Sequence, residues 1–147
     1  YQKNEETNLL NVNLIIKDVT KKYDSKKINL KLENTNEIKL RPNSFKRCLT
    51  NIIDNGLSYG KKVEIITKQK MNDLIILIDD DGPGIPENER QNVIKPFYRI
   101  DKSRGQNKSG VGLGLSITND IIRSHGGSIS FEDSPLSGLR VKISLPS

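Results

Sequence analysis

The apolar residues of this 147-residue chain fall in blocks whose spacing predicts alternating strands and helices. The plainest block follows Pro42, where apolar residues recur at steps of three and four: Phe45, Cys48, Leu49, Ile52 and Ile53. This spacing places all of them on one face of a helix, for which Ser44 is a candidate N-cap. Further helices are predicted over residues 14–23, 87–94 and 113–124.

Strands are predicted where apolar residues alternate with polar ones or form short continuous runs: residues 9–13, 28–32, 38–40, 63–67, 74–78, 128–131 and 139–145. The continuous run at 74–78 is typical of a buried central strand. Gly126-Gly127 is expected to end the last helix, and Pro135 and Gly138 mark a turn between the last two strands. Helices that must all cover one face of such a sheet indicate an α/β (α+β) two-layer sandwich.

Length and composition favour a single folded domain over residues 1–147. No apolar run approaches the roughly 20 residues needed to span a bilayer, and the first residues lack the features of a secretory signal. The single cysteine, Cys48, lies in the apolar stripe and cannot form an internal disulfide, which suits a reducing compartment. A cytoplasmic domain is therefore expected.

The formal charge of +6 raises the possibility of a nucleic-acid partner. The lysine pairs 21–22, 26–27 and 61–62 are scattered along the chain without stacking aromatics between them, and aromatic residues make up only 5% of the total. Solvated faces are the favoured interpretation of these lysines, and no nucleic-acid binding is predicted.

Asn51 and Asn55 lie one helical turn apart, so their amides point to the same region. An amide oxygen is a hard ligand suited to Mg²⁺, which keeps several waters and is completed by substrate phosphates. The alternative is a pair of surface asparagines, since the chain is rich in this residue.

Asp80 follows the predicted central strand and opens the segment Asp80-Asp81-Gly82-Pro83-Gly84. Its carboxylate can accept a hydrogen bond from the exocyclic amine of adenine, and glycines at 82 and 84 let the backbone approach a ligand closely. The alternative is an ordinary acidic turn. Asp79 and Asp81 are expected to face solvent, because three carboxylates cannot share one buried site cheaply.

Glycines at 110, 112 and 114 open the last predicted helix, whose free N–H groups and dipole would face a triphosphate. The pattern is not a Walker A loop, because Lys108-Ser109 lacks the preceding glycine. It is not the Gly-x-Gly-x-x-Gly dinucleotide pattern either, because position 115 is Leu. Together with the Asn pair and Asp80, this glycine run indicates an ATP pocket.

The motifs and their order resemble the catalytic ATP-binding domain of sensor histidine kinases, in the superfamily that also holds gyrase-type, Hsp90-type and mismatch-repair ATPases. The resemblance covers nearly the whole chain and rests on four boxes: an N box at 51–60, a G1 box at 80–85, an F box at 95–99 and a G2 box at 110–116. It implies the Bergerat ATP-binding fold, a mixed β-sheet with helices on one face. Arg41-Pro42, the G1 box and Pro96-Phe97 point within this family to the EnvZ-type osmosensor kinases.

The resemblance implies that Asp80 binds the adenine amine, Asn55 is the principal Mg²⁺ ligand and Tyr59 stacks near the base. Arg99 would contact phosphate, and Val111 to Leu115 would hold the phosphate chain. The residues expected at the nucleotide are Asn55, Gly56, Leu57, Ser58, Tyr59, Asp80, Gly82, Gly84, Ile85, Arg99, Ile100, Gly110, Val111, Gly112, Leu113, Gly114 and Leu115. Many members carry Lys or Arg where this chain has Ser58. This departure shifts the expected phosphate contacts toward Arg99, Lys61 or the loop before Gly110, whose Lys102, Arg104 and Lys108 could close over the phosphates as a lid.

Asn51 is the expected catalytic residue and helps to choose among branches of the superfamily. Members that hydrolyse ATP usually carry Glu there, which can act as a general base. An amide cannot take that proton, so Asn51 favours a kinase that presents ATP to a neutral imidazole by positioning and charge neutralisation. The only histidine, His125, is expected to be a structural residue at the end of the last helix.

The resemblance implies partners outside this chain. A dimerising, histidine-bearing phosphoacceptor domain of the same full-length protein, with membrane-spanning and sensory segments, is expected upstream of Tyr1, and a response regulator would take the phosphoryl group onward. The full-length protein is expected in the inner or plasma membrane, whereas this domain alone would be monomeric and without direct membrane contact. The alternatives are a nucleotide-binding signalling module without competent transfer, a stand-alone ATPase and a basic scaffold protein.

Overall fold

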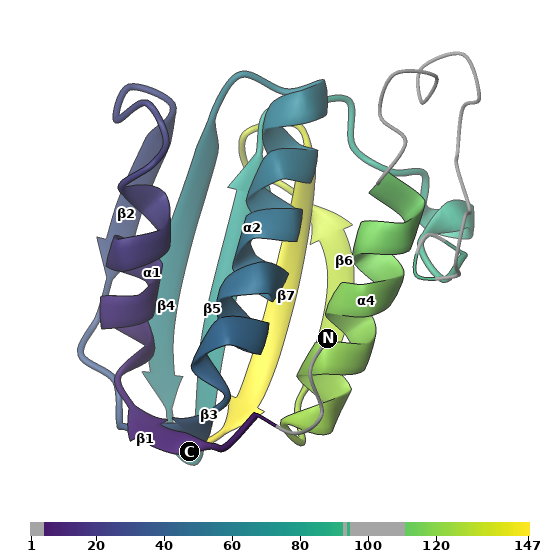
Figure 1. The fold of residues 1–147 in the computed structure, drawn as a ribbon. Helices are drawn as coiled ribbons and strands as arrows, with labels where there is room; N and C mark the ends of the chain where they lie inside the picture. The colour runs from purple at the N-terminus through teal and green to yellow at the C-terminus, as the bar shows by residue number, and fades with distance from the viewer. Residues whose placement is uncertain (1–4, 93, 95–110) are drawn as a thin grey trace.

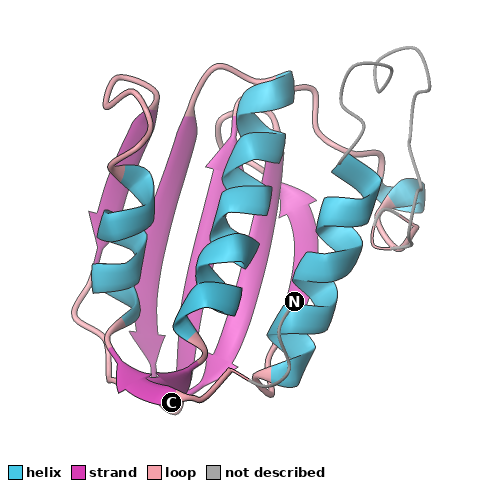
Figure 2. Ribbon diagram, in the orientation of Figure 1, coloured by secondary structure: helices cyan, strands magenta, loops and turns pink. Residues whose placement is uncertain are grey.

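The computed structural model describes residues 5–92, 94 and 111–147 and forms a two-layer α/β sandwich (Figures 1 and 2). Five strands form the main sheet in the order β2 (Ile28–Leu32), β4 (Val63–Lys70), β5 (Asp73–Asp80), β7 (Leu139–Pro146) and β6 (Ser128–Asp133). The sheet is mixed, because β2 and β4 are parallel whereas the other neighbours are antiparallel. The two-layer sandwich predicted from the sequence is confirmed.

In the described residues, three α-helices cover one face of this sheet: α1 (Val12–Thr20), α2 (Pro42–Tyr59) and α4 (Val111–Ser124). A small second sheet pairs β1 (Asn8–Leu10) with β3 (Ile38–Leu40) in antiparallel register. The strands before and after the polar residues 34–36 do not pair with each other. The first, β2, belongs to the main sheet, and the second, β3, belongs to the small one. Within the described part of the chain, no helix is long and apolar enough to cross a membrane.

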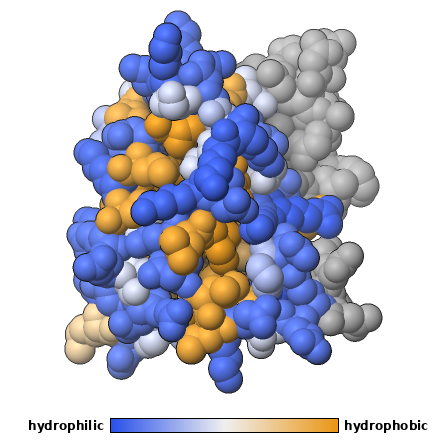
Figure 3. Space-filling view, turned by 60° about the vertical axis from the view of Figure 1, so that its left-hand side comes forward, coloured by the Kyte–Doolittle hydropathy of each residue, from blue (hydrophilic) through white to orange (hydrophobic). Residues whose placement is uncertain are grey.

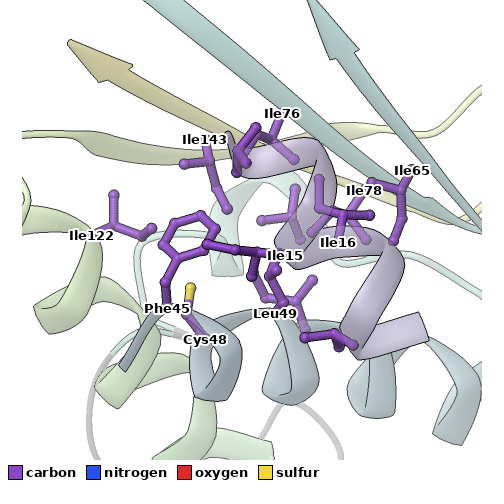
Figure 4. Close-up of a cluster of buried hydrophobic side chains, with 14 of the residues drawn as sticks. Ile15, Ile16, Phe45, Cys48, Leu49, Ile65, Ile76, Ile78, Ile122 and Ile143 are labelled. Carbon is purple, nitrogen blue, oxygen red and sulfur yellow. The ribbon is translucent and has the colours of Figure 1, made fainter. Parts of the chain in front are cut away.

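The core lies between the helices and the main sheet. The stripe predicted for α2 is buried, with Phe45, Cys48, Leu49, Ile52 and Ile53 each at most 2% exposed. Figure 4 shows side chains of α1, α2 and α4 meeting those of the strands, labelled Ile15, Ile16, Phe45, Cys48, Leu49, Ile65, Ile76, Ile78, Ile122 and Ile143. Burial of these side chains holds each helix on the sheet and so fixes where the helix ends lie.

The start of α2 differs from the prediction, because Ser44 is not its N-cap. The helix begins at Pro42, whose fixed φ suits a first helical position, and Ser44 lies buried in the first turn. Glu5 caps the helix instead: its carboxylate accepts the N–H groups of Asn43 (2.7 Å) and Ser44 (2.9 Å) and the Ser44 hydroxyl (2.9 Å). Partial burial acts to raise the pKa of Glu5, but these hydrogen bonds outweigh it and lower the pKa.

The helix predicted over residues 87–94 is shorter than expected. A single 3₁₀ turn, η1 (Glu87–Glu89), is followed by turns in the described residues up to 94. The Arg90 N–H donates to the carbonyl of Glu87, three residues earlier (3.3 Å). Such 3₁₀-type bonds stand here in place of the four-residue bonds of an α-helix.

The end of α4 agrees with the prediction. The N–H groups of Gly126 and Gly127 each donate to a carbonyl of the last turn, those of Arg123 and Ile122, both at 3.0 Å. Gly126 has a φ of +78°, the left-handed conformation that this kind of helix end requires.

His125 joins the end of α4 to the start of α2. Its Nδ1 donates to the Ile121 carbonyl (2.8 Å), and its Nε2 accepts the Arg41 N–H (3.0 Å). Burial lowers the pKa of His125, which suits the neutral ring that this pair of bonds requires. The last residues of α4 thus meet the first of α2, so the two helices run antiparallel and the N-terminus of α4 lies at the end of the molecule where α2 stops (Figure 1).

Candidate nucleotide-binding site

Asp80 is the last residue of β5 and turns its carboxylate inward, toward the helix layer, with 8% of the residue exposed. Its Oδ1 accepts two backbone N–H groups, from Gly82 (2.9 Å) and Leu139 (3.1 Å). Burial raises the pKa of Asp80, while these two bonds act in the opposite direction. With Oδ1 so engaged, the Oδ2 oxygen is left to accept a donor from a ligand.

Glycines surround this carboxylate because other chain segments approach it too closely for a side chain. A Cβ on Gly56 of α2 would lie 3.2 Å from the Asp80 Cβ and 3.5 Å from Oδ2. A Cβ on Gly138, in the β6–β7 turn, would collide with Asp80 Oδ1 and with the backbone of Asp80 and Gly82. A Cβ on Gly82 would lie 3.1 Å from the backbone of Tyr59. The N box, the G1 box and the β6–β7 turn therefore interlock around Asp80.

Of the two neighbouring carboxylates, Asp79 is not the solvent-facing group that the sequence suggested, whereas Asp81 is partly exposed. Asp79 is 1% exposed and forms a bidentate ion pair with Arg140 of β7, with Oδ1–Nε and Oδ2–Nη2 distances of 2.7 and 2.9 Å. Asp81 Oδ1 accepts the N–H groups of Lys61 (2.6 Å) and Lys62 (2.9 Å), and these bonds lower its pKa. Asp79 and Asp80 do not share one buried site, because side chains alternate along β5 and these two lie on opposite faces of the sheet.

Asn51 and Asn55 lie one turn apart on the C-terminal half of α2, both half-buried. The Asn55 Oδ1 atom is buried and has no hydrogen-bond partner among the described residues. A buried acceptor without a donor is costly unless a ligand completes it, so this oxygen fits a Mg²⁺ ion. The described residues contain no group of three His, Cys, Asp or Glu side chains that could hold a metal ion.

The other expected residues of the N and G1 boxes lie around the same end of α2. Leu57 and Ile85 are partly buried and pack against the core, so they offer apolar walls. Ser58 and Tyr59 are half-buried in the last turn of α2, and Gly84 has a φ of +76° that favours glycine. The loop after β5 thus contacts the end of α2 at Gly82 and the β6–β7 turn at Gly84, with Ile85 packed inward.

The G2 box supplies the first turns of α4. The helix starts at Val111, and its backbone through Gly112, Leu113 and Gly114 leads to Leu115, which is buried. The first turn of α4 lies at the same end of the molecule as the C-terminal ends of α2 and β5, so an anion at its N–H groups would meet the positive end of the helix dipole (Figure 1). Arg99, Ile100 and Gly110 lie outside the described residues, as does the loop with Lys102, Arg104 and Lys108.

Residues that the motifs did not reveal also shape the site. Leu139 and Gly138 hold Asp80 from the β6–β7 turn, about sixty residues further along the chain. Arg90 ties the loop after β5 to β6: Nε donates to the Ile85 carbonyl (3.1 Å) and Nη2 to Asp133 (2.6 Å). The sequence predicted the turn at Gly138, but it did not indicate that this turn lies against Asp80.

Comparison with known proteins identifies the family. Residues 41–147 match the family described as histidine kinase-, DNA gyrase B-, and HSP90-like ATPase, so the chain belongs to this family. It is an ATP-binding domain of the kind that serves as the catalytic domain of sensor histidine kinases.

Two relatives illustrate the match. The sensor histidine kinase CpxA of Escherichia coli (strain K12) is 42% identical over 106 residues, which cover 71% of this chain and 23% of CpxA. The signal transduction histidine-protein kinase ArlS of Staphylococcus aureus (strain USA300) is 41% identical over 110 residues, 73% of this chain and 24% of ArlS. The chain thus spans about a quarter of the length of these curated relatives.

Solved structures agree in fold. The catalytic domain of histidine kinase ThkA superposes with a TM-score of 0.80 at 24% identity, over 96% of this chain and 95% of that domain. The histidine kinase domain of the E. coli osmosensor EnvZ gives 0.71 at 29% identity, over 99% and 91% of the two chains. An EnvZ-like type agrees with this second match, while the higher identities to CpxA and ArlS do not single EnvZ out.

Proposed function

We propose that this chain is the ATP-presenting part of a two-component sensor histidine kinase. It binds Mg-ATP between α2, the end of β5 and the first turn of α4, and presents the γ-phosphoryl group to a histidine on a separate domain. The observation that carries the proposal is the Asp80 carboxylate, buried and oriented by two backbone N–H groups inside a ring of glycines. Such an oriented buried acceptor is what recognition of a single amine donor requires.

Each group has a role that its position supports. Asp80 Oδ2 accepts the adenine amine, and the unpartnered Asn55 Oδ1 coordinates Mg²⁺. When bound, the metal ion neutralises phosphate charge and the nucleotide supplies the group that is transferred. The backbone N–H groups at Val111 and Gly112 cradle phosphate, with Tyr59 beside the base and Arg99 at the phosphates.

Asn51 separates the proposed kinase from a stand-alone ATPase. A neutral amide cannot remove a proton from water, so this chain lacks a general base at the position where a carboxylate would serve hydrolysis. The acceptor imidazole is supplied from outside, because the one histidine, His125, is occupied by Ile121 and Arg41 at the far end of α4. The proposal therefore assigns positioning and charge neutralisation to this chain.

The proposal extends to the partners and location of the whole protein. The chain acts as one domain with a phosphoacceptor domain of the same protein and a response regulator downstream. The full-length protein lies in the inner or plasma membrane with this domain in the cytoplasm, and the isolated domain is a monomer.

Calorimetric titration of ATP, with and without Mg²⁺, tests the site. Wild type should bind ATP saturably, and Asp80→Asn should weaken binding by roughly 10- to 100-fold, because a charged hydrogen bond contributes about 1.5–3 kcal/mol. Asn retains an oxygen for the Gly82 and Leu139 N–H groups, so the variant should stay folded. Unchanged affinity in this variant would reject the assignment of Asp80.

Transfer needs a second experiment, because binding alone also suits a signalling module. The chain is mixed with a separately prepared phosphoacceptor domain of the same protein and γ-labelled ATP. Label on the acceptor histidine supports the kinase. Saturable binding without label would leave the signalling module, and steady phosphate release without any partner would indicate an ATPase.

A further inference from the structure

Asp81 lies between two residues of the nucleotide site, Asp80 and Gly82, but its carboxylate bonds to the segment that follows α2. Its Oδ1 accepts the N–H groups of Lys61 (2.6 Å) and Lys62 (2.9 Å), the two residues directly before β4. One side chain of the G1 box therefore holds the connection between the N box and the next strand.

This contact begins where the pairing of β4 with β5 stops. The antiparallel ladder ends at the pair Val63–Asp80, and the next two residues, Lys62 and Asp81, are joined through the Asp81 side chain. Lys61 and Lys62 are exposed, and Figure 3 shows mainly hydrophilic side chains over this end of the face that carries α1. Because water competes for N–H groups at such a surface, burial alone does not fix the connection, and the carboxylate orders it.

The ordered connection touches the G1 turn at two glycines. A Cβ on Gly60 would lie 2.5 Å from Asp81 Oδ1 and 2.8 Å from the Gly82 nitrogen. A Cβ on Gly82 would lie 3.1 Å from the carbonyl carbon and oxygen of Tyr59. The backbone at the end of the N box thus packs directly on the G1 turn, and Asp81 fastens the two segments together.

The same turn orients the carboxylate that is proposed to bind the nucleotide. The Gly82 N–H donates to Asp80 Oδ1 (2.9 Å), and this N–H belongs to the peptide that joins Asp81 to Gly82. Fixing the Asp81 side chain fixes the direction of that N–H and so favours one rotamer of Asp80. The other donor to Oδ1, the Leu139 N–H (3.1 Å), comes from β7 and holds the carboxylate from the opposite segment.

We propose that Asp81 is a positioning residue for adenine recognition. By holding the end of the N box on the G1 turn, it orients the Gly82 N–H and, through it, the Asp80 carboxylate that accepts the amine. This inference rests on the proposed function, since it takes Asp80 as the acceptor. A role of Asp81 in stability alone predicts a different result, because it gives no discrimination between nucleotides.

Calorimetry with two nucleotides separates these roles. ATP and purine riboside triphosphate, which lacks only the amine of the base, are titrated with Mg²⁺ into wild type, Asp81→Ala and Asp81→Asn. Wild type should prefer ATP by roughly 10- to 100-fold, the value of one charged hydrogen bond. Asp81→Ala should reduce this preference at least threefold, because the Gly82 N–H and Asp80 are no longer held. Asp81→Asn keeps an oxygen for the Lys61 and Lys62 N–H groups and should retain most of the preference.

The ratio of the two affinities is the readout that a structural role does not move. Asp81→Ala that weakens both nucleotides by the same factor, with the ratio unchanged, would overturn this inference alone. A wild type that binds both nucleotides equally would reject the proposed role of Asp80 and the inference with it. Asp81→Ser, whose side-chain oxygen lies one bond closer to the backbone, takes the place of Asp81→Ala if amide NMR spectra show that variant to be unfolded, and the same loss of preference is expected.

Asp24→Ala is the matched control. Asp24 Oδ1 accepts the N–H of Lys26 (3.0 Å) in the turn before β2, so this variant also removes a carboxylate that bonds to a backbone N–H between two elements. It should keep the wild-type affinity for both nucleotides. An equal loss of preference in Asp24→Ala and Asp81→Ala would contradict a special role of Asp81.

Discussion

Gly138 is the residue where the geometry of the site tolerates least change. A Cβ there meets Asp80 Oδ1 and two backbone groups, so the turn or the Asp80 carboxylate has to move. Gly138→Ala should lower the free energy of unfolding by about 1–3 kcal/mol, the usual cost of overpacking, and should reduce ATP affinity more than tenfold. Urea denaturation and calorimetry on the same preparation measure both effects.

Gly126 provides the control, because it needs glycine for its backbone alone. Its φ is +78°, while the nearest atom to an added Cβ, Pro146 Cγ, is 3.6 Å away. Gly126→Ala should cost about 1–2 kcal/mol of stability and leave ATP affinity unchanged. If both alanine variants lost affinity equally, ATP binding would be reporting general destabilisation, and the special role of Gly138 would be rejected.

Asp79 and Arg140 join β5 to β7 on the face of the sheet without helices. Because Asp79 is buried while the Arg140 side chain keeps 21% of its surface exposed, Asp79→Ala should cost about 3 kcal/mol, the lower end of the range for breaking a buried pair. The exposed Lys31–Glu64 pair on the same face is the comparison, since Lys31→Ala should cost about 0–1 kcal/mol. Urea denaturation of the two variants measures how much unfolding free energy each loses. Equal losses would contradict the expectation that the buried pair contributes more than the exposed one.

At the scale of elements, the local patterns predicted what local physics determines. The apolar stripe of α2, the continuous strand β5 and the glycine end of α4 each depend on residues close in sequence, and the structure has all three. The failures share another cause: the Glu5 cap on α2 and the Arg140 partner of Asp79 lie 39 and 61 residues away from the groups they bind. No local periodicity carries such pairings, so Ser44 and Asp79 were assigned wrongly.

The same distinction applies to the candidate site. The sequence alone could propose Asp80, Asn55 and the glycine run as site residues, because their types and spacing suit nucleotide chemistry. It could not propose Leu139, Gly138 and Arg90. Leu139 contributes a backbone N–H, Gly138 the absence of a side chain, and Arg90 a guanidinium that holds a loop. In the sequence, these residues look the same as those of any turn or surface.

His125 makes the contact between α4 and α2 sensitive to pH. Burial lowers the pKa of His125 in the folded state, so below about pH 6.5 the unfolded chain takes up a proton that the folded chain does not. The contribution of His125 to the free energy of unfolding is fully present above about pH 6.5. It is lost as the pH falls toward the pKa of His125 in the folded state, by at most about 1.4 kcal/mol per pH unit.

Urea denaturation at pH 7.5, 6.5 and 5.5 measures this contribution when wild type is compared with His125→Ala. The difference in unfolding free energy between the two proteins should shrink as the pH falls. A constant difference would show that the pKa of His125 is the same in the folded and unfolded states, and would contradict the expected effect of burial.

For the whole molecule, ATP binding predicts a rise in thermal stability. A ligand that binds only the folded state stabilises it by about 2.7 kcal/mol at a hundred times its Kd, and a domain of this size gains roughly 2–4 °C in Tm per kcal/mol, so ATP should raise Tm by roughly 5–10 °C. At the same ATP concentration, Asp80→Asn should lose about half or more of this shift, because a 10- to 100-fold weaker Kd leaves only about 0.4–1.4 kcal/mol of stabilisation. The Gly126→Ala variant should retain the shift, because Gly126 follows the last turn of α4, at the other end of this helix from the proposed phosphate contacts. Thermal scans of both variants with and without Mg-ATP measure the shift. Loss of the shift in both variants would mean that it reports general destabilisation, whereas loss in Asp80→Asn alone would support the assignment of Asp80.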